Sequence, residues 1–305
     1  MYDVVIVGSG PAGLCAAVYA KRAMLNMVVI EKNGYSGGQI INTSEVDNYL
    51  GLQGVSGFDM AMNFRAHAEH FGVLFVDGEV VNVTDINDSF ELEMSDGKKI
   101  MTKTVIVATG AGYSKLNVPG EKEFVGKGVS YCATCDGAFY KGKVVAVVGG
   151  GDVALGDALY LSKIASKVYL IHRRDELRGA KTLQERIFAT ENIEFVPDTV
   201  VTSINGNDGG MVGSISIKNV KDDKEVLLDI NGIFVAVGMK PETDFVKELV
   251  ETDDRGYIVA GEDGITSRAG IFVAGDARAK KLRQVITAVA DGACAVDSAE
   301  KYLCR

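Results

Sequence analysis

The sequence has few cysteines, and their spacing argues against most structural uses of thiols. Five cysteines in 305 residues are too few for a disulfide framework. A structural zinc site needs about four ligands, and Cys15, Cys294 and Cys304 form no second closely spaced pair. The other two cysteines, Cys132 and Cys135, therefore need a different explanation.

The chain also lacks a long apolar run and an excess of positive charge. No apolar stretch approaches the roughly 18 residues that a membrane span requires. The net charge of −9 argues against nucleic acid or anionic membrane surfaces as partners. Residues 1–6 are typical of a strand and lack the basic region and cleavage site of a signal peptide. We expect a cytoplasmic, two-domain protein that binds neither nucleic acid nor membranes.

A closely spaced cysteine pair is the most informative feature that is present. Cys132 and Cys135 stand two residues apart and are followed directly by Asp136. Such a pair can close into a small disulfide and open again, which makes it a two-electron switch. In a reducing compartment, a reactive pair of this kind is expected only as a catalytic one.

Two glycine-rich motifs flank the cysteine pair in the sequence. Each follows an apolar strand and opens a helix, the context that a dinucleotide-binding fingerprint requires. We expect strands at 3–7, 27–30, 143–148 and 167–171, and helices at about 12–24 and from 152 to about 165. The sequence therefore predicts an α/β fold with two Rossmann-like, three-layered dinucleotide-binding domains. The motif residues are Gly8, Ser9, Gly10, Pro11, Ala12 and Gly13, and then Gly149, Gly150, Gly151, Asp152, Val153 and Ala154.

The residues that end the second strand of each unit indicate different ligands. Glu31 stands 23 residues after Gly8 and suits ribose hydroxyls, so the first site favours FAD or NAD(H). His172 stands 23 residues after Gly149 and begins a basic run with Arg173, Arg174 and Arg178. Guanidinium groups bind phosphate bidentately, so the second site favours NADP(H). The alternative is a solvated basic helix start, because Asp175 and Glu176 lie nearby.

A third feature lies near the C-terminus, where an apolar strand at 270–274 ends in Gly275 and Asp276. An aspartate in this place can bind a polyol, with a helix that begins around Arg283 and Gln284 behind it. If this segment joins the first site, that domain is built from both chain ends and the middle is an insertion. Residues 110–114 and 238–241 are predicted to be the linkers.

Taken together, these motifs resemble those of the bacterial low-molecular-weight thioredoxin reductases, over essentially the full chain. The most specific match is Cys132–Gly137 followed by the set His172, Arg173, Arg174 and Arg178. Further matching segments are Gly8–Gly13, Gly37–Gln39, Ala108–Thr109–Gly110, Gly149–Ala154, Gly275–Asp276 and Arg283–Gln284.

The resemblance implies an FAD domain at 1–113 and 246–305, with an inserted NADPH domain at 114–245. It implies NADPH-dependent reduction of the thioredoxin disulfide, a homodimer, and rotation between two domain orientations. Cys135 would lie nearer the flavin, Cys132 would attack the thioredoxin disulfide, and Asp136 would donate and accept the proton. Asp136 as a plain turn residue before Gly137 is the alternative. The implied FAD contacts include Gly38, Gln39, Asn48, Ala108, Thr109, Gly110, Gly275, Asp276, Arg283 and Gln284.

The chain departs from the family pattern at the second glycine motif. Val153 replaces the usual Ser or Thr and removes a hydroxyl worth about 1 kcal/mol of binding. Gly156 and Asp157 replace two glutamates. Three alternatives stay open: a ferredoxin-fed or otherwise NADPH-independent disulfide reductase, a flavin-dependent dithiol oxidase that uses O₂, and a redox-sensing flavoprotein that acts as a binding module.

Overall fold

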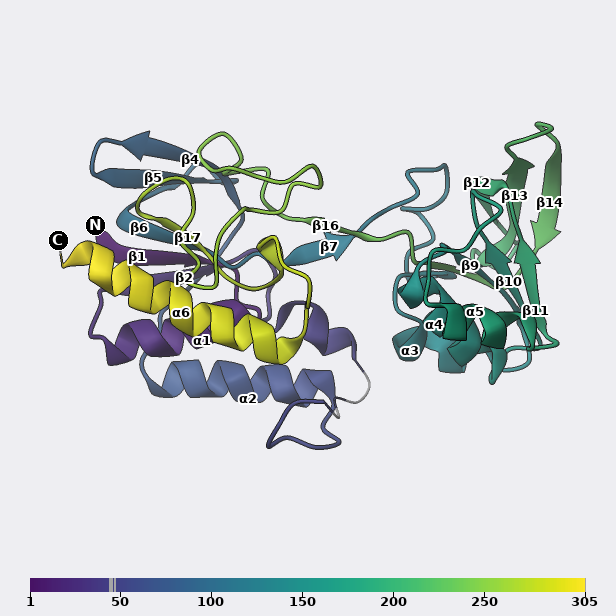
Figure 1. The fold of residues 1–305 in the computed structure, drawn as a ribbon, viewed down its shortest axis with the longest axis horizontal. Helices are drawn as coiled ribbons and strands as arrows, with labels where there is room; N and C mark the ends of the chain where they lie inside the picture. Colours follow the sequence, from purple (N-terminus) through teal and green to yellow (C-terminus); the bar gives the residue numbers. More distant parts are fainter. Residues whose placement is uncertain (44–45, 47, 305) are drawn as a thin grey trace. The chain divides into compact units, whose positions relative to one another are not determined.

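The structure, a computed structural model, describes residues 1–43, 46 and 48–304, without the side chains of Asn42 and Cys135. The chain divides into two units (Figure 1). Unit 1 consists of Met1–Gly112 and Lys240–Arg305, and unit 2 of Tyr113–Met239. Each unit is described below by itself.

Unit 1 is built on a sheet whose central strands run parallel. The order is β3-β2-β1-β6-β5-β4, and β17 pairs with the end of β6. β4 and β5 run antiparallel. The strands are β1 (Tyr2–Val7), β2 (Met27–Glu31), β3 (Phe75–Asp77), β4 (Val80–Ile86), β5 (Ser89–Met94), β6 (Lys99–Val107) and β17 (Ile271–Val273). The inner strands are continuous apolar runs because both faces of a parallel sheet are buried.

Three helices cover one face of this sheet, and α1 and α6 lie side by side (Figure 1). A β-carbon added at Gly292 of α6 would lie 2.2 Å from the carbonyl oxygen of Ala12 in α1, so glycine is what permits this close packing. The helical segments are α1 (Pro11–Arg22), η1 (Gly38–Asn42), α2 (Gly57–His70), η3 (Gly275–Ala277) and α6 (Val285–Leu303). A second cluster, which includes Val246 and Ile258, fills the opposite face.

Unit 2 has a fully parallel sheet of order β11-β10-β9-β15-β8, between helices and a separate antiparallel sheet β12-β13-β14. The strands are β8 (Val129–Ser130), β9 (Val144–Val148), β10 (Lys167–Ile171), β11 (Ile193–Val196), β12 (Thr199–Gly206), β13 (Val212–Asn219), β14 (Glu225–Asp229) and β15 (Gly232–Val235). The helical segments are α3 (Ala133–Asp136), η2 (Gly137–Tyr140), α4 (Asp152–Ser162) and α5 (Lys181–Phe188). The predicted α/β class with two βαβ units is confirmed.

The two chain segments that join the units are strands, whereas the sequence predicted plain linkers. β7 (Ala111–Tyr113) and β16 (Met239–Pro241) pair with each other. Backbone hydrogen bonds continue the pairing at both ends, from Ser114 N to Gly238 O at 2.9 Å and from Glu242 N to Gly110 O at 3.1 Å. Two glycine-containing segments with no obvious strand pattern became strands because each supplies the partner of the other.

Both predicted nucleotide-site helices end earlier than expected. α1 stops at Arg22, and Met24, the predicted last residue, has a left-handed φ of 57°. α4 stops at Ser162, and the expected end was about Ala165. The sequence does not mark either helix end, because neither a glycine nor a proline follows Arg22 or Ser162 directly.

The packing of α1 on α6 leads to a stability prediction. Gly292→Ala should destabilise the protein by roughly 1–3 kcal/mol, the usual cost of overpacking a core, because the added methyl group would meet backbone atoms of α1. Gly156→Ala in α4 is the matched control, since nothing lies within 4 Å of the added carbon. Alanine there should raise stability by about 0.5–1 kcal/mol. Thermal denaturation of both variants measures the difference, and an unchanged melting temperature for Gly292→Ala would contradict the close packing.

Candidate active site

The first glycine loop joins β1 to α1 and leaves no space for side chains at two of its glycines. Gly8 has φ +103°, and an added β-carbon would lie 2.4 Å from the carbonyl oxygen of Ala108. An added β-carbon at Gly13 would lie 1.9 Å from the carbonyl oxygen of Gly8. At Gly10 the nearest such atom is 4.0 Å away, so the middle of the loop is open. Closed ends and an open middle are what a loop needs to receive a pyrophosphate on its backbone.

Glu31 ends β2 and holds this loop in place. Its Oε2 accepts hydrogen bonds from the backbone N (2.7 Å) and Oγ (2.6 Å) of Ser9. Its Oε1 accepts from the backbone N (2.9 Å) and Nδ2 (3.1 Å) of Asn33. A carboxylate has about four acceptor positions, so ribose hydroxyls can bind Glu31 only when Ser9 Oγ or Asn33 Nδ2 turns away.

The other predicted residues around this loop are placed on its border by neighbouring segments. Thr109 Oγ1 donates to the carbonyl oxygen of Glu242 at 2.6 Å, and Gln39 Nε2 donates to the carbonyl oxygen of Ala111. Gly38, at the start of η1, lies against Gly10. Ala108 and Gly110 flank Thr109 at the carboxyl end of β6. The carboxyl ends of β1 and β6 are thus brought to one place, where an α/β sheet binds ligands.

Asp276 and Arg283 carry buried polar atoms that have no hydrogen-bond partner among the described residues. These atoms are Asp276 Oδ1 and Arg283 Nε. Burial raises the pKa of the Asp276 carboxyl, and the cations of Lys280 and Arg283 oppose this effect. Lys280 Nζ lies 3.7 Å from Asp276 Oδ1. Native proteins rarely leave such atoms unpaired, so both atoms fit a bound polyol or phosphate, and FAD offers each.

A buried ion network that the sequence did not indicate fixes the turn of Asp276. Asp291 in α6 accepts from the backbone N of Gly275 (3.0 Å), from Arg278 (2.9 Å) and from Lys280 (2.9 Å). On the same side, Asn48 Nδ2 donates to Gln284 Oε1 at 3.0 Å. Residue type and spacing gave no signal for Asp291, because its role depends on how α6 packs against η3.

The second glycine loop repeats the geometry of the first in unit 2. Gly149 has φ +153°, and an added β-carbon would lie 2.3 Å from the carbonyl oxygen of Ala236. The ring of His172 occupies the side-chain space at Gly150, at 2.5 Å. Gly151 is open, and the buried Ala154 packs under the loop. This loop can receive a pyrophosphate as the first one can.

The arginines of the basic run lie in a loop between β10 and α5, so they are not part of a helix start. Arg173, Arg174 and Arg178 are exposed, and among the described residues none of the three has a side-chain ion pair. Asp175, which could have neutralised them, pairs instead with Lys221 at 3.1 Å. The guanidinium groups are therefore available for a phosphate.

His172 completes this site from beneath the glycine loop. Its Nε2 is buried without a partner in the part of the chain that the structure describes. Burial lowers its pKa, and the neighbouring arginines lower it further, so the ring stays neutral at pH 7. Asp152, the first residue of α4, accepts a hydrogen bond from the backbone N of Ala180 at 2.7 Å.

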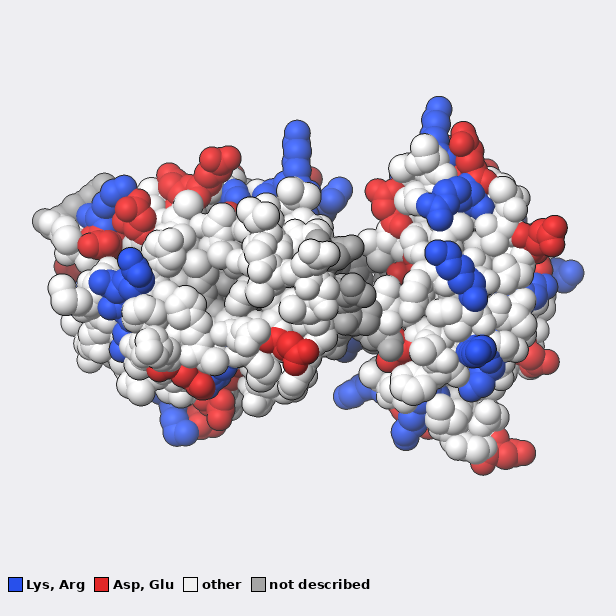
Figure 2. All heavy atoms as spheres, turned by 90° about the horizontal axis from the view of Figure 1, so that it is seen from below, with Lys and Arg blue, Asp and Glu red and all other residues white. Residues whose placement is uncertain are grey.

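Charge is distributed in small patches on both units. Figure 2 shows acidic and basic side chains interspersed on the face that it draws. This face therefore presents no broad region of one charge to a phosphate.

Cys132 follows β8 at the carboxyl edge of the parallel sheet and is disulfide-bonded. Its backbone N donates to Ser130 Oγ at 3.1 Å, and Ser130 Oγ donates to its carbonyl oxygen at 3.2 Å. The Thr134 hydroxyl lies 3.4 Å from Cys132 Sγ. The side chain of Cys135 lies outside the described part of the chain, so its pairing with Cys132 stays a prediction.

The free cysteines of the described residues have a different character. Cys15, Cys294 and Cys304 are the free thiols. Burial raises the pKa of Cys15 to about 11, which keeps it a protonated and unreactive thiol at pH 7.

Asp136 lies beside the cysteine pair, and Asp157 acts on Tyr113, whose ring stacks on the residue before Cys132. Asp136 ends α3, half-buried, and its backbone N donates to the carbonyl oxygen of Cys132 at 3.2 Å. Asp157 lies in α4 and forms no hydrogen bond or ion pair with the described residues. Burial raises the pKa of Asp157 to about 7. Burial also raises the pKa of Tyr113, and the charge of Asp157 raises it further. Tyr113 stacks on Tyr131, the residue before Cys132, at a ring distance of 5.7 Å.

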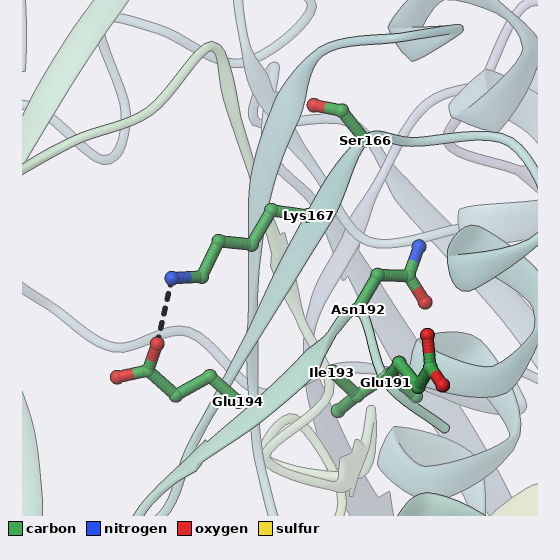
Figure 3. A pocket seen from close by; sticks show the side chains of 6 residues that line it. All are labelled: Ser166, Lys167, Glu191, Asn192, Ile193 and Glu194. Atoms are coloured by element: carbon green, nitrogen blue, oxygen red, sulfur yellow. Dashed lines mark ion pairs between the residues drawn. The ribbon is translucent and has the colours of Figure 1, made fainter.

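The hollow drawn in Figure 3 lies at the other end of the sheet of unit 2 from the second glycine loop. It is lined by Ser166, Lys167, Glu191, Asn192, Ile193 and Glu194 (Figure 3). These residues precede or begin β10 and β11, and Lys167 pairs with Glu194 at 2.7 Å. Ligands of α/β sheets bind at the carboxyl ends of the strands, and this hollow is at the amino ends.

Comparison with known proteins gives consistent matches along the whole chain. Residues 2–292 match the family described as pyridine nucleotide-disulphide oxidoreductase. The chain is 43% identical to the thioredoxin reductase of Listeria innocua over 99% of this chain and 94% of the relative. It is 41% identical to the thioredoxin reductase of Bacillus subtilis over 99% and 95% of the two chains.

A solved structure agrees with these relatives. The thioredoxin reductase of Lactococcus lactis matches with a TM-score of 0.84 and 41% identity, over 100% of this chain and 99% of that one. The resemblance predicted from the motifs is confirmed.

The raised pKa of Asp157 leads to a pH-dependent stability prediction. The carboxyl titrates near 3.8 when unfolded and at about 7 when folded. Between these values the unfolded chain ionises first, so the stability of the folded protein falls as the pH rises from about 4 to 7. Asp157→Asn should be more stable than the unaltered protein at pH 8, by roughly 1–3 kcal/mol at about 1.4 kcal/mol per pH unit, discounted for partial exposure.

Denaturant unfolding of both proteins at pH 5 and pH 8 measures this difference, which should shrink at pH 5. Asp175→Asn is the control, because Lys221 lowers the pKa of that exposed carboxyl and no titration is expected between these pH values. A stability difference for Asp157→Asn that did not change with pH would contradict the burial of an unpaired carboxyl.

Proposed function

Because this chain belongs to the pyridine nucleotide-disulphide oxidoreductase family, we propose that it is an NADPH-dependent thioredoxin reductase with FAD as its second cofactor. Unit 1 binds FAD and unit 2 binds NADPH and carries the dithiol of Cys132 and Cys135. The substrate is the disulfide of thioredoxin, the activity for which the relatives are named.

The observation that carries this proposal is the position of Cys132. β8, β15 and β9 are parallel neighbours, so their carboxyl ends lie at one edge of the sheet. Cys132 follows the end of β8, and Gly149 follows the end of β9. A disulfide-bonded cysteine and a dinucleotide loop at one edge of one sheet fit a single electron path between nicotinamide and disulfide.

The overall reaction transfers two electrons. NADPH, a proton and oxidised thioredoxin give NADP⁺ and thioredoxin with two thiols. The first glycine loop, Asp276 and Arg283 would hold FAD, which would supply the two-electron chemistry that links the nicotinamide to the enzyme disulfide.

The residues around the dithiol handle sulfur and protons. The reduced Cys132 thiolate attacks a thioredoxin sulfur, and the displaced thioredoxin thiolate takes up a proton. Cys135 loses its proton and attacks Cys132 Sγ, which closes the enzyme disulfide and releases the second thioredoxin sulfur as a thiolate that takes a proton from water. Asp136 supplies and regains the proton, and the Thr134 hydroxyl, 3.4 Å from Cys132 Sγ, can stabilise the thiolate.

One feature of the surface of unit 2 extends this proposal. Phe139 in η2 follows Asp136 by three residues, and its side chain is 73% exposed. An exposed aromatic ring beside a dithiol suits docking of a protein substrate.

We also propose that the protein is a cytoplasmic homodimer. Sedimentation of the FAD-loaded protein tests the dimer. Within the described residues, no helix is long and apolar enough to span a membrane.

Single cysteine replacements test the assigned path. Cys132→Ser and Cys135→Ser should each lose thioredoxin reduction by several orders of magnitude, because neither single thiol can form the enzyme disulfide. Both should still allow NADPH to reduce bound FAD, since that step needs neither sulfur. Cys135→Ser should form a stable mixed disulfide with a thioredoxin that lacks its resolving cysteine, visible by gel electrophoresis under non-reducing conditions.

Cys294→Ser is the matched control, because this cysteine is exposed and free, and its activity should equal that of the unaltered protein. Substantial turnover of thioredoxin by Cys132→Ser or Cys135→Ser would show that the pair is not the relay.

A further inference from the structure

We infer that Asp152 is a positioning residue for nucleotide specificity, which acts by clamping the arginine loop onto the second glycine loop. This inference rests on the proposed use of NADPH and adds a residue that selects it. The segment concerned, the clamp segment, is Arg178–Gly179–Ala180. The anchor is the glycine loop with the first turn of α4.

Three consecutive backbone N–H groups of the clamp segment donate to this anchor. The N–H groups of Arg178 and Gly179 donate to the carbonyl oxygen of Gly150, at 2.6 and 3.1 Å. The N–H group of Ala180 donates to Asp152 Oδ1 at 2.7 Å. Of the acceptors in these three hydrogen bonds, only the carboxylate of Asp152 belongs to a side chain. It holds the clamp segment against the start of α4.

The fit between the clamp segment and α4 is close. An added β-carbon at Gly179 would lie 2.4 Å from Leu155 Cδ1 and 3.2 Å from Asp152 Oδ1. On the other side, Gln184 Nε2 of α5 donates to the carbonyl oxygens of Gly179 (2.7 Å) and Leu177 (3.1 Å). The backbone of Arg178 is therefore fixed from two sides, although its side chain is exposed.

The charge of Asp152 makes its position informative. A carboxylate at the first turn of a helix favours the helix dipole but repels an anion that binds at the same helix end. A direct role in holding pyrophosphate would therefore be unfavourable. A backbone clamp explains the acid: it places Arg178 where a phosphate of NADPH can reach the guanidinium, and the contact with Ala180 already uses the carboxylate.

A charge that repels the nucleotide and a contact that holds the loop predict opposite changes in NADP⁺ affinity for Asp152→Ala. If the carboxylate acted only through its charge, its removal would tighten binding of NADP⁺ and NAD⁺ alike. If the carboxylate clamps the loop, its removal weakens the binding of NADP⁺ and leaves the binding of NAD⁺ unchanged, because only NADP⁺ has the 2′-phosphate. A lost charge-assisted phosphate bond corresponds to roughly 10–100-fold in dissociation constant, which is the upper limit for this variant.

The experiment measures dissociation constants of NADP⁺ and NAD⁺ for the oxidised, FAD-loaded protein by isothermal titration calorimetry. Asp152→Ala should raise the dissociation constant of NADP⁺ severalfold to tenfold or more. Asp152→Asn should keep NADP⁺ binding, since the Asn oxygen can still accept from Ala180 N without the charge. In a background of Arg178→Ala, Asp152→Ala should have no further effect, because the clamp acts through Arg178. Steady-state kinetics should show the change in KM for NADPH and not in kcat.

Asp175→Ala is the control for removing an acid beside the arginines, because Asp175 pairs with Lys221 and does not contact the clamp segment. It should leave the preference for NADP⁺ intact. The inference is overturned if Asp152→Ala binds NADP⁺ as tightly as the unaltered protein, or more tightly. It is overturned if this variant loses affinity for NADP⁺ and NAD⁺ to the same degree, or if its effect on NADP⁺ affinity adds to that of Arg178→Ala. It is also overturned if Asp152→Asn fails like Asp152→Ala. Equal affinity of the unaltered protein for both nucleotides would instead refute the proposed function.

Discussion

One steric constraint, used twice, determines how both units of this protein are built. At the first glycine of each loop, a backbone carbonyl from a neighbouring strand end occupies the place of a side chain. The oxygen is that of Ala108 beside Gly8, at 2.4 Å, and that of Ala236 beside Gly149, at 2.3 Å. Because any β-carbon would collide with these backbone atoms, strand, loop and helix can meet only through glycine. The open positions at Gly10 and Gly151 then leave backbone N–H groups free for pyrophosphate.

The two sites differ in the charges that complete them. In unit 1, Ser9 and Asn33 occupy the acceptor positions of Glu31, and buried atoms of Asp276 and Arg283 have no hydrogen-bond partner among the described residues. In unit 2, the arginines of the basic run form no ion pair with the residues that the structure describes, and Asp175, in the same segment, pairs with Lys221. Glu31 can accept from ribose hydroxyls when Ser9 Oγ or Asn33 Nδ2 turns away, and guanidinium groups without ion pairs suit a phosphate. One loop geometry therefore serves two nucleotides.

Local sequence patterns predicted the parts of the fold that local chemistry determines. The strands next to Gly8 and Gly149, and the placement of Glu31 and His172, follow from apolar runs and fixed spacing. The pairing of β7 with β16 was not predictable, because each strand depends on a partner more than 120 residues away. The same reason applies to Asp291 and to the contact of Asp152 with Ala180, which arise from packing between distant segments. The sequence left the basic run open between a phosphate site and a solvated helix start; the structure places it in a loop and pairs Asp175 with Lys221, which supports the proposed phosphate site.

The claim that two nucleotide sites supply electrons to one dithiol is tested most directly by an anaerobic titration of the FAD-loaded protein, followed by flavin absorbance. The account predicts that NADPH bleaches the flavin, that NADH does so far less readily, and that oxidised thioredoxin then restores the oxidised spectrum. A flavin that NADPH reduces but oxidised thioredoxin cannot reoxidise, or one that NADPH does not reduce, would contradict it.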